Sequence, residues 1–255
     1  YFEHSLIEPI RLYDTEGNAI SGNVFERPKS QAIIIYLGGQ NPIWMNDYEA
    51  DGIYTRAIID GDSGGEYTLS WQQTSQLSWV SGAGTENDPY IIADLIIDAN
   101  NSGSGIEIRD SEGIYFIIQN CTIYNSSFNK AGIQLSDTNN GLLIGNNCSN
   151  NYDGIIIEGS NNTLVDNIIH DNDHYGIDVY DGFNHIINNS FDDNWDIAIH
   201  LVTANNNTIS GNYFEGILTS DFGIVSYRSN HSIITGNYFE HSLIEPIRLY
   251  DTEGN

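Results

Sequence analysis

A run of carboxylates and imidazoles in the middle of this chain could support chemistry. The run comprises His170, Asp171, Asp173, His174, Asp178, Asp181, Asp192, Asp193, Asp196 and His200, with Tyr175 among them. Paired carboxylates can supply the acid and the base of glycoside hydrolysis. Carboxylate oxygens are also the ligands that Ca²⁺ prefers. The residues that would hold calcium are Asp171, Asp173, Asp178 and Asp181, and no other cofactor is expected.

Three features weigh against catalysis by this run. Enzymes that act on uronates neutralise the sugar carboxylate with Arg or Lys, yet only Lys130 and Arg228 occur between residues 110 and 247. The Asp residues stand in Asn/Asp/Gly-rich bends, where Asp is favoured structurally. The His residues have no regular spacing. We therefore predict no catalytic residue and no enzyme, while a solvated acidic bend remains an open alternative to a calcium site.

The elements that position these residues are indicated by a repeated motif of a small residue, Ile, any residue and usually an aliphatic one. Its Ile falls at Ile106, Ile133, Ile155, Ile177, Ile199, Ile224 and Ile247. The steps between these positions are 27, 22, 22, 22, 25 and 23 residues. A second mark, an Asn behind a short aliphatic run, follows at Asn120, Asn146, Asn167, Asn189, Asn212 and Asn237.

Self-similarity at a fixed period is typical of a solenoid. A 22-residue unit fits one coil of a right-handed parallel β-helix, with short strands that each pair with their equivalent one coil along. Ile, Leu and Val would point inward, Gly and Asn would stand at the bends, and stacked Asn side chains could form ladders. We predict an all-β protein, a right-handed parallel β-helix with a β-rich connector. A β-sandwich is the alternative.

The repeated motif resembles the NosD-like and carbohydrate-binding or sugar-hydrolase parallel β-helix repeats of archaeal and bacterial surface proteins. The sequence Gly84-Thr85-Glu86-Asn87-Asp88-Pro89-Tyr90-Ile91-Ile92 also looks like that family's usual start of a coil run. The resemblance covers roughly residues 90–255 and 1–36. It implies the fold and allows a carbohydrate-binding or polysaccharide-degrading role, as a lyase, hydrolase or epimerase.

Composition narrows the class of partner. The chain has 35 acidic and 8 basic residues and a net charge of −27, so we expect neither nucleic acid nor an anionic membrane surface as a partner. No run of 18 apolar residues predicts a membrane span. The Lys-poor composition with two Cys residues indicates an extracellular or cell-surface protein. Cys121 and Cys148 stand about one coil apart, and their pairing is left open.

Eight Asn-x-Ser/Thr sequons suit an exported glycoprotein. They begin at Asn100, Asn120, Asn125, Asn147, Asn161, Asn188, Asn206 and Asn230. Asn-rich bends also generate such sequons by chance. We expect Asn120 to be a buried ladder residue, and we expect glycans at Asn125, Asn161, Asn206 and Asn230, which fall in outer turns.

The two ends of the chain have the same sequence. Residues 1–18 and 238–255 both read YFEHSLIEPIRLYDTEGN. Ile33 then falls 23 residues after Ile10, where a next coil is due. We therefore expect residues 1–36 to be closing coils, 37–89 a β-rich connector or capping module that holds three of the four Trp residues, and 90–255 the main coils.

These observations predict a structural, extracellular β-helix that is tandemly repeated or assembles end to end into a surface filament or appendage. Its partners would be copies of itself, and a passive surface or adhesin module differs only in its partner. The alternative is a carbohydrate-binding or polysaccharide-degrading β-helix, with a groove lined by His174, Tyr175, Asp178, Tyr180 and Trp195.

Overall fold

The computed structural model describes residues 57–61, 69–77, 79–215, 222–240 and 245–255, together with the short strands at 2–3, 10–13, 25–26, 33–36 and 53–54. The chain divides into two compact units, residues 1–54 and 55–255. Of the predicted closing coils at 1–36, residues 14–24 and 27–32 lie outside the described residues, as do the predicted boundary between residues 36 and 37 and residues 37–52 of the predicted connector at 37–89. Each unit is described here by itself.

The first unit contains five short strands, two pairs of which are parallel. The strands are β1 (Phe2–Glu3), β2 (Ile10–Tyr13), β3 (Phe25–Glu26), β4 (Ile33–Tyr36) and β5 (Ile53–Tyr54). Strand β1 pairs with β3 and β2 with β4. Phe2 stands opposite Phe25, and Ile10 stands opposite Ile33. Both pairs have the 23-residue offset expected of neighbouring coils.

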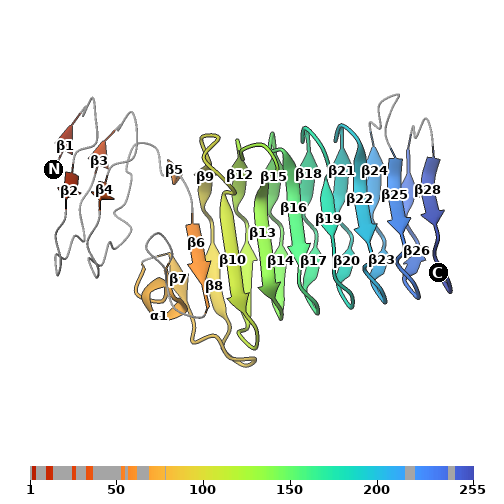
Figure 1. Ribbon diagram of the computed structural model, residues 1–255, viewed down its shortest axis with the longest axis horizontal. Coiled ribbons are helices and arrows are strands. Elements are labelled where there is room, and N and C mark those ends of the chain that lie inside the picture. Colours follow the sequence, from red (N-terminus) through yellow and green to blue (C-terminus); the bar gives the residue numbers. More distant parts are fainter. Residues whose placement is uncertain are drawn as a thin grey trace. The chain divides into compact units, whose positions relative to one another are not determined.

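The second unit is a parallel β-helix with three long sheets (Figure 1). The first sheet has eight strands in the order β28-β25-β22-β19-β16-β13-β10-β6. These are β6 (Ala57–Asp60), β10 (Ile106–Ser111), β13 (Ala131–Thr138), β16 (Asp153–Glu158), β19 (Ile177–Val179), β22 (Ile197–Val202), β25 (Phe222–Tyr227) and β28 (Glu245–Tyr250). Strand β6 shows that parallel pairing begins inside the predicted connector.

The second sheet also has eight strands, in the order β26-β23-β20-β17-β14-β11-β8-β7. These are β7 (Val80–Ser81), β8 (Tyr90–Ala93), β11 (Phe116–Gln119), β14 (Gly141–Ile144), β17 (Thr163–Val165), β20 (His185–Ile187), β23 (Thr208–Ser210) and β26 (Ile233–Thr235). Strand β7 is antiparallel to β8. The third sheet stacks β27 (Tyr238–Phe239), β24 (Tyr213–Glu215), β21 (Ser190–Asp192), β18 (Ile168–His170), β15 (Asn147–Ser149), β12 (Thr122–Tyr124) and β9 (Ile96–Asp98).

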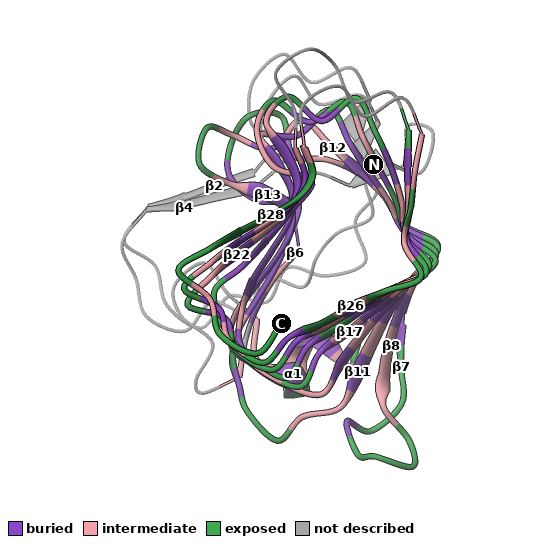
Figure 2. Cartoon of the chain, turned by 90° about the vertical axis from the view of Figure 1, so that its right-hand side faces the viewer, coloured by how far each residue is buried: buried purple, intermediate pink, exposed green. Residues whose placement is uncertain are grey.

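The register confirms the repeat read from the sequence. Each predicted anchor Ile stands opposite the next, from Ile106 and Ile133 through to Ile224 and Ile247. The anchors from Ile106 to Ile224 are fully buried. Figure 2, which views the stack end-on, shows buried stretches in purple recurring in the strands of successive coils. Alternation of side chains along each short strand explains this, because every second residue faces the interior.

Asparagine ladders close the bends, as predicted. The backbone N–H and the side-chain amide of Asn167 both donate to Asn189 Oδ1, at 3.0 and 2.9 Å. Asn146, Asn212 and Asn237 continue this ladder. A second ladder contains Ser126, Asn151, Asn172 and Asn194, and a third contains Asn162, Asn184, Asn207, Ser232 and Asn255.

The prediction for Asn120 was wrong. Asn120 is exposed and has a φ of 53°. The ladder position in its coil belongs to Cys121, whose N–H donates to Asn146 Oδ1 at 3.0 Å. The residue before each Asn of the first ladder has positive φ, including Gly145, Asp166 and Asn188. Asn120 fills that left-handed position, which Asn, Asp and Gly tolerate.

A single turn of helix, α1 (Trp71–Thr74), lies before the main coils and was not expected from the sequence. Ser70 caps it through a capping box with Gln73. Trp71 stacks on Tyr90 with ring centroids 4.7 Å apart, and its indole N–H donates to Ser111 Oγ at 2.9 Å. In the described part of the chain, no helix is long and apolar enough to cross a membrane.

Candidate functional site

Two His–Asp pairs lie on the outer face of the first sheet. His174 Nδ1 is 3.0 Å from Asp153 Oδ1, and His200 Nδ1 is 3.0 Å from Asp178 Oδ1. The register explains the second pair, because Asp178 on β19 stands directly opposite His200 on β22. A carboxylate at Nδ1 favours the tautomer in which Nδ1 carries the proton. This leaves Nε2 of each imidazole free to accept one.

Both carboxylates are held by further donors and are shielded from water. Asp153 and Asp178 are buried, whereas their His partners are partly exposed. The backbone N–H of Tyr175 donates to Asp153 Oδ1 at 2.9 Å, and the Tyr180 hydroxyl donates to Asp178 Oδ2 at 2.6 Å. Each carboxylate therefore orients one imidazole from below while the ring reaches toward solvent.

Aromatic rings run across the same face. Consecutive centroids lie 4.9 Å apart from Tyr152 to His174, 3.6 Å from His174 to Tyr175 and 4.6 Å from Tyr175 to His200. Phe128 packs edge-on against Tyr152. We call Tyr152, Asp153, His174, Tyr175, Asp178 and His200 the acid–aromatic face. Its rings offer apolar surface beside groups that can exchange protons.

Burial and negative charge shape the protonation of this face. Burial raises the pKa of Asp153, while the Tyr175 N–H and His174 partly offset that rise. Burial, followed by the nearby carboxylates of Asp196 and Asp178, raises the pKa of Tyr175 to about 12. Burial and the hydrogen bond to Asp178 also raise the pKa of Tyr180. The tyrosines therefore stay neutral donors at physiological pH.

Four of the five residues predicted to line a groove are linked by contacts. His174 stacks on Tyr175, Tyr175 packs against His200, and His200 and Tyr180 both contact Asp178. Trp195 lies in the bend after β21 and is 68% exposed. Asp153 was missed, although its position just before the small residue of the repeated motif could have pointed to it.

The four residues predicted to bind calcium lie at different points around one coil. Asp178 is buried in β19, Asp171 follows β18 and contacts His170 at 2.7 Å, and Asp173 and Asp181 are exposed in turns. In the described ranges, no group of three or more His, Cys, Asp or Glu side chains has metal-binding geometry. Calcium binding by these four residues stays a prediction.

The predicted glycosylation sites differ in exposure. Asn161 and Asn206 are exposed in positive-φ bends. Asn125 and Asn230 are half-buried, and the Asn125 amide donates to Asp98 Oδ1 at 2.9 Å. Glycan attachment stays a prediction at all four residues, with the least steric conflict at Asn161 and Asn206.

Comparisons with known proteins identify the fold family. The model of the right-handed beta helix region matches residues 85–214, so the chain belongs to this family. No curated protein matches it.

Two solved structures are similar to this chain at low sequence identity. The periplasmic alginate epimerase AlgG is 17% identical with a TM-score of 0.43, over 62% of this chain and 45% of that one. The A-module of the Azotobacter vinelandii mannuronan C-5 epimerase AlgE4 is 14% identical with a TM-score of 0.40, over 98% of this chain and 76% of that one. The chain thus spans less than half the length of AlgG.

Proposed function

We propose that the acid–aromatic face binds an uncharged saccharide chain and can transfer protons to it. The observation that carries this proposal is the placement of Tyr175 between two buried carboxylates that each orient a histidine. Sugar rings stack on aromatic faces through their C–H surface, and their hydroxyls bond to carboxylate and imidazole groups.

The charge of the face favours a neutral sugar over a uronate. Asp153 and Asp178 lie on the face, and Asp196 is close enough to raise the pKa of Tyr175. A polyuronate would place further negative charge against them, with a Coulomb cost that rises as water is excluded. Phe128, which is 74% exposed and packs against Tyr152, extends the apolar surface beyond the face.

Binding is tested by titrating neutral hexose oligosaccharides and oligouronates into the protein by calorimetry. We expect neutral chains to bind, and Tyr175→Ala to weaken binding about tenfold, the equivalent of roughly 1.4 kcal/mol. Asp171→Asn is the matched control, because Asp171 is exposed and lies outside the face. Binding of oligouronates alone, or equal binding by Tyr175→Ala, would contradict the proposal.

Proton transfer is tested separately with Asp178→Asn. This change keeps the size and shape of the side chain but removes its negative charge and one of the two acceptor oxygens that face Tyr180 and His200. We expect saccharide binding to persist and any shortening of a neutral polysaccharide, followed by product chromatography, to be lost. If the wild-type protein binds the polysaccharide without shortening it, the acid–aromatic face only binds saccharide and does not transfer protons to it.

A second candidate function is structural, and the repeated segment favours it. Residues 1–18 and 238–255 have the same sequence, and the strands β2 and β28 within them each pair in parallel with a neighbouring coil at a 23-residue offset. We propose an extracellular β-helix that is tandemly repeated or assembles end to end. Sequencing past Asn255 tests the covalent form, which requires Ala-Ile-Ser-Gly-Asn to follow. Sedimentation velocity tests the non-covalent form, which requires elongated oligomers.

A further inference from the structure

The second sheet of the β-helix differs from the other two in its charge. No Asp, Glu, Lys or Arg occurs in its described strands, from β7 to β26, and His185 is their only histidine. The strands of the first sheet include Glu107 and Glu158, and those of the third include Asp192 and Glu215. The whole chain has a net charge of −27. The acidic residues are therefore distributed so that one sheet has none.

The outward side chains of this sheet are mostly apolar. Inward residues such as Ile118 and Leu143 are fully buried, and the residues beside them point outward and are partly exposed. The register aligns the outward residues in two columns along the helix axis. Figure 2 shows this sheet, labelled β8, β11, β17 and β26, as one side of the coil. Its partly exposed aliphatic residues, which we call the uncharged face, are Ile91, Ile117, Leu142, Ile144, Val165 and Ile187.

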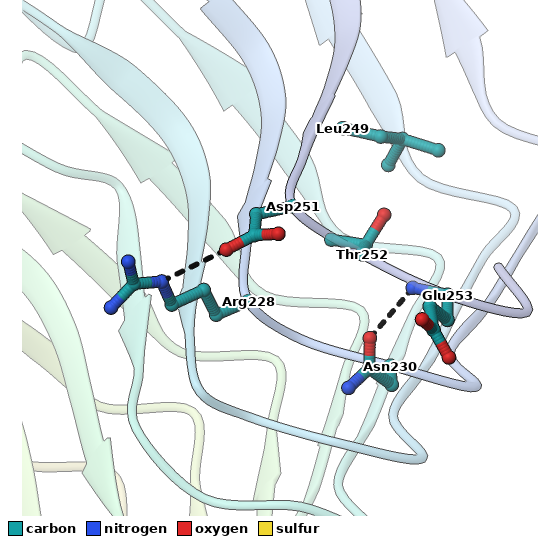
Figure 3. Close-up of a pocket in the computed structure, with 6 residues that line it drawn as sticks. All are labelled: Arg228, Asn230, Leu249, Asp251, Thr252 and Glu253. Atoms are coloured by element: carbon teal, nitrogen blue, oxygen red, sulfur yellow. Dashed lines mark hydrogen bonds and ion pairs between the residues drawn. The ribbon is translucent and has the colours of Figure 1, made fainter.

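Charge returns in the bends beside the sheet. Figure 3 shows a shallow depression in the last two coils, lined by Arg228, Asn230, Leu249, Asp251, Thr252 and Glu253. Arg228 Nε donates to Asp251 Oδ2 at 3.1 Å, and the N–H of Glu253 donates to Asn230 Oδ1 at 2.6 Å. These groups bond to one another between neighbouring coils and lie outside the two columns. The surface without charge is therefore confined to the strands.

The size of the sheet sets how strong a contact it could make. Seven of its eight strands are parallel, since only β7 is antiparallel. At about 4.8 Å between strands and about 3.3 Å per residue, these strands cover roughly 300–400 Å². A specific interface buries about 600 Å² or more on each partner. The Asn-rich bends on both sides of the sheet would have to supply the remainder as a polar rim. We therefore expect a reversible contact with a Kd of about 1 μM.

The charge distribution indicates the occupant of the uncharged face. A basic partner would be attracted to the acidic residues of the first and third sheets instead. Two copies of the chain repel each other through those sheets, but they can meet through the second sheet with their carboxylates pointing away from the contact. A second copy also has the same spacing between coils, so each row of Ile, Leu and Val can face an equivalent row.

We propose that two copies of this chain dock back to back through the uncharged face. Sheets packed in this way lie about 10 Å apart, with the side chains of the two columns interdigitated. The contact uses the same surface on both copies, so it closes at two copies. The acid–aromatic face lies on the first sheet and stays accessible in both copies. This inference is independent of both proposed functions.

Strand β14 gives the sharpest test, because it lies in the middle of the uncharged face. A two-fold axis centred on the face brings β14 of one copy against β14 of the other. We expect the wild-type full chain to form dimers in sedimentation velocity as its concentration is raised. Ile144→Glu and Ile144→Lys should each weaken the dimer at least about tenfold, because like charges would meet near the axis. An equimolar mixture of the two variants should recover a dimer, since Glu then faces Lys.

Ile168 supplies the matched control. It is an outward residue of β18 in the third sheet and is 51% exposed. Ile168→Glu and Ile168→Lys make the same chemical changes away from the proposed contact, and both should dimerise like wild type. Recovery of the mixed dimer shows that the Ile144 variants are folded, and circular dichroism checks this for each variant alone.

Three results would overturn the proposed dimer. The first is a wild-type chain that stays monomeric at every concentration, including one that uses Ile144 to bind an insoluble polysaccharide surface instead. The second is association that the Ile144 substitutions leave unchanged, or that continues beyond two copies in spite of them, as end-to-end assembly would. The third is a mixture of the Glu and Lys variants that remains monomeric, because β14 would then not face β14.

Discussion

At the scale of single residues, buried polar groups depend most on having the right hydrogen-bond partners. Asp153 shows this, because its carboxyl is buried yet accepts bonds from the Tyr175 N–H and faces His174. Burial costs the charged form more than these donors restore, so the pKa of Asp153 is raised. The residue holds its imidazole in place at a cost in stability.

The raised pKa of Asp153 predicts the direction of its pH dependence. The folded state keeps this proton to a higher pH than the unfolded chain. The contribution of Asp153 to the free energy of unfolding therefore falls as pH rises from about 4, the usual carboxyl pKa, through the raised folded value. Above that value it is constant while His174 keeps one protonation state.

Urea unfolding of wild type and Asp153→Asn across that pH range measures the effect. As pH rises, the unfolding free energy of wild type should fall relative to that of Asp153→Asn. The other acids cancel in the difference, apart from Asp178, which also raises the pKa of Asp153. If the difference in unfolding free energy does not change with pH, or if wild type gains stability relative to the variant, the pKa of Asp153 is not raised.

The two thiols give a second prediction at this scale. Cys121 and Cys148 are free and buried, and both face the interior. Burial raises the pKa of Cys121 to about 11 and raises the pKa of Cys148 as well. Because the thiolate is the reactive form, we expect neither Cys to react with Ellman's reagent at pH 8 in the folded protein. Both should react in urea, and rapid labelling of the native protein would show that the coils open there.

At the scale of elements, the asparagine ladders join neighbouring coils in addition to the pairing of the strands. Asn189 accepts from the backbone and side chain of Asn167 and donates to Leu164 O, Ile187 O and Asn212 Oδ1. A buried group that loses its partner costs about 1–3 kcal/mol. The ladder therefore fixes the register of the bends independently of the hydrophobic columns.

Substitution of one ladder residue tests this role. We expect Asn189→Ala to lower the unfolding free energy by roughly 2–4 kcal/mol, since at least two buried groups lose partners. Asn188→Gly is the control, because Asn188 is exposed at a φ of 55° that Gly adopts freely. Similar losses for the two variants in urea titration would mean that the ladder contributes little.

At the scale of the whole molecule, charge opposes assembly while sequence repetition favours it. A net charge of −27 on 255 residues makes two copies repel each other. The end-to-end contact of the second candidate function would be built from main-chain pairing and stacked apolar residues, like those between neighbouring coils of this chain. Salt should therefore strengthen it, because the Debye length falls from about 30 Å at 0.01 M to about 3 Å at 1 M.

Sedimentation velocity at several salt concentrations measures this balance. We expect the fraction of elongated oligomers to rise with sodium chloride and to respond little to chelators. Oligomers that dissociate in salt would indicate a contact made by ion pairs. Loss of oligomers in EDTA would instead support the calcium prediction for the acidic bends, because a bridging divalent cation would then be required.

The sequence by itself determined the coil register of this protein. The anchor Ile residues recur at near-constant steps, and a column of buried side chains tolerates no shift by one residue without exposing its apolar atoms. The same logic predicted the ladders from Asn146 to Asn237. It failed at Asn120, because the left-handed bend position and the ladder position are adjacent and Asn suits both.

Only the tertiary structure decided which polar residues meet. Asp153 and His174 are 21 residues apart, and their contact depends on where each strand starts within its coil. Local sequence does not specify that starting point, since Asp in a bend and Asp beside a strand look alike. Side chains on neighbouring coils come together through the stacking of whole strands. The acid–aromatic face therefore emerged from the fold, whereas the repeat that builds it was already present in the chain.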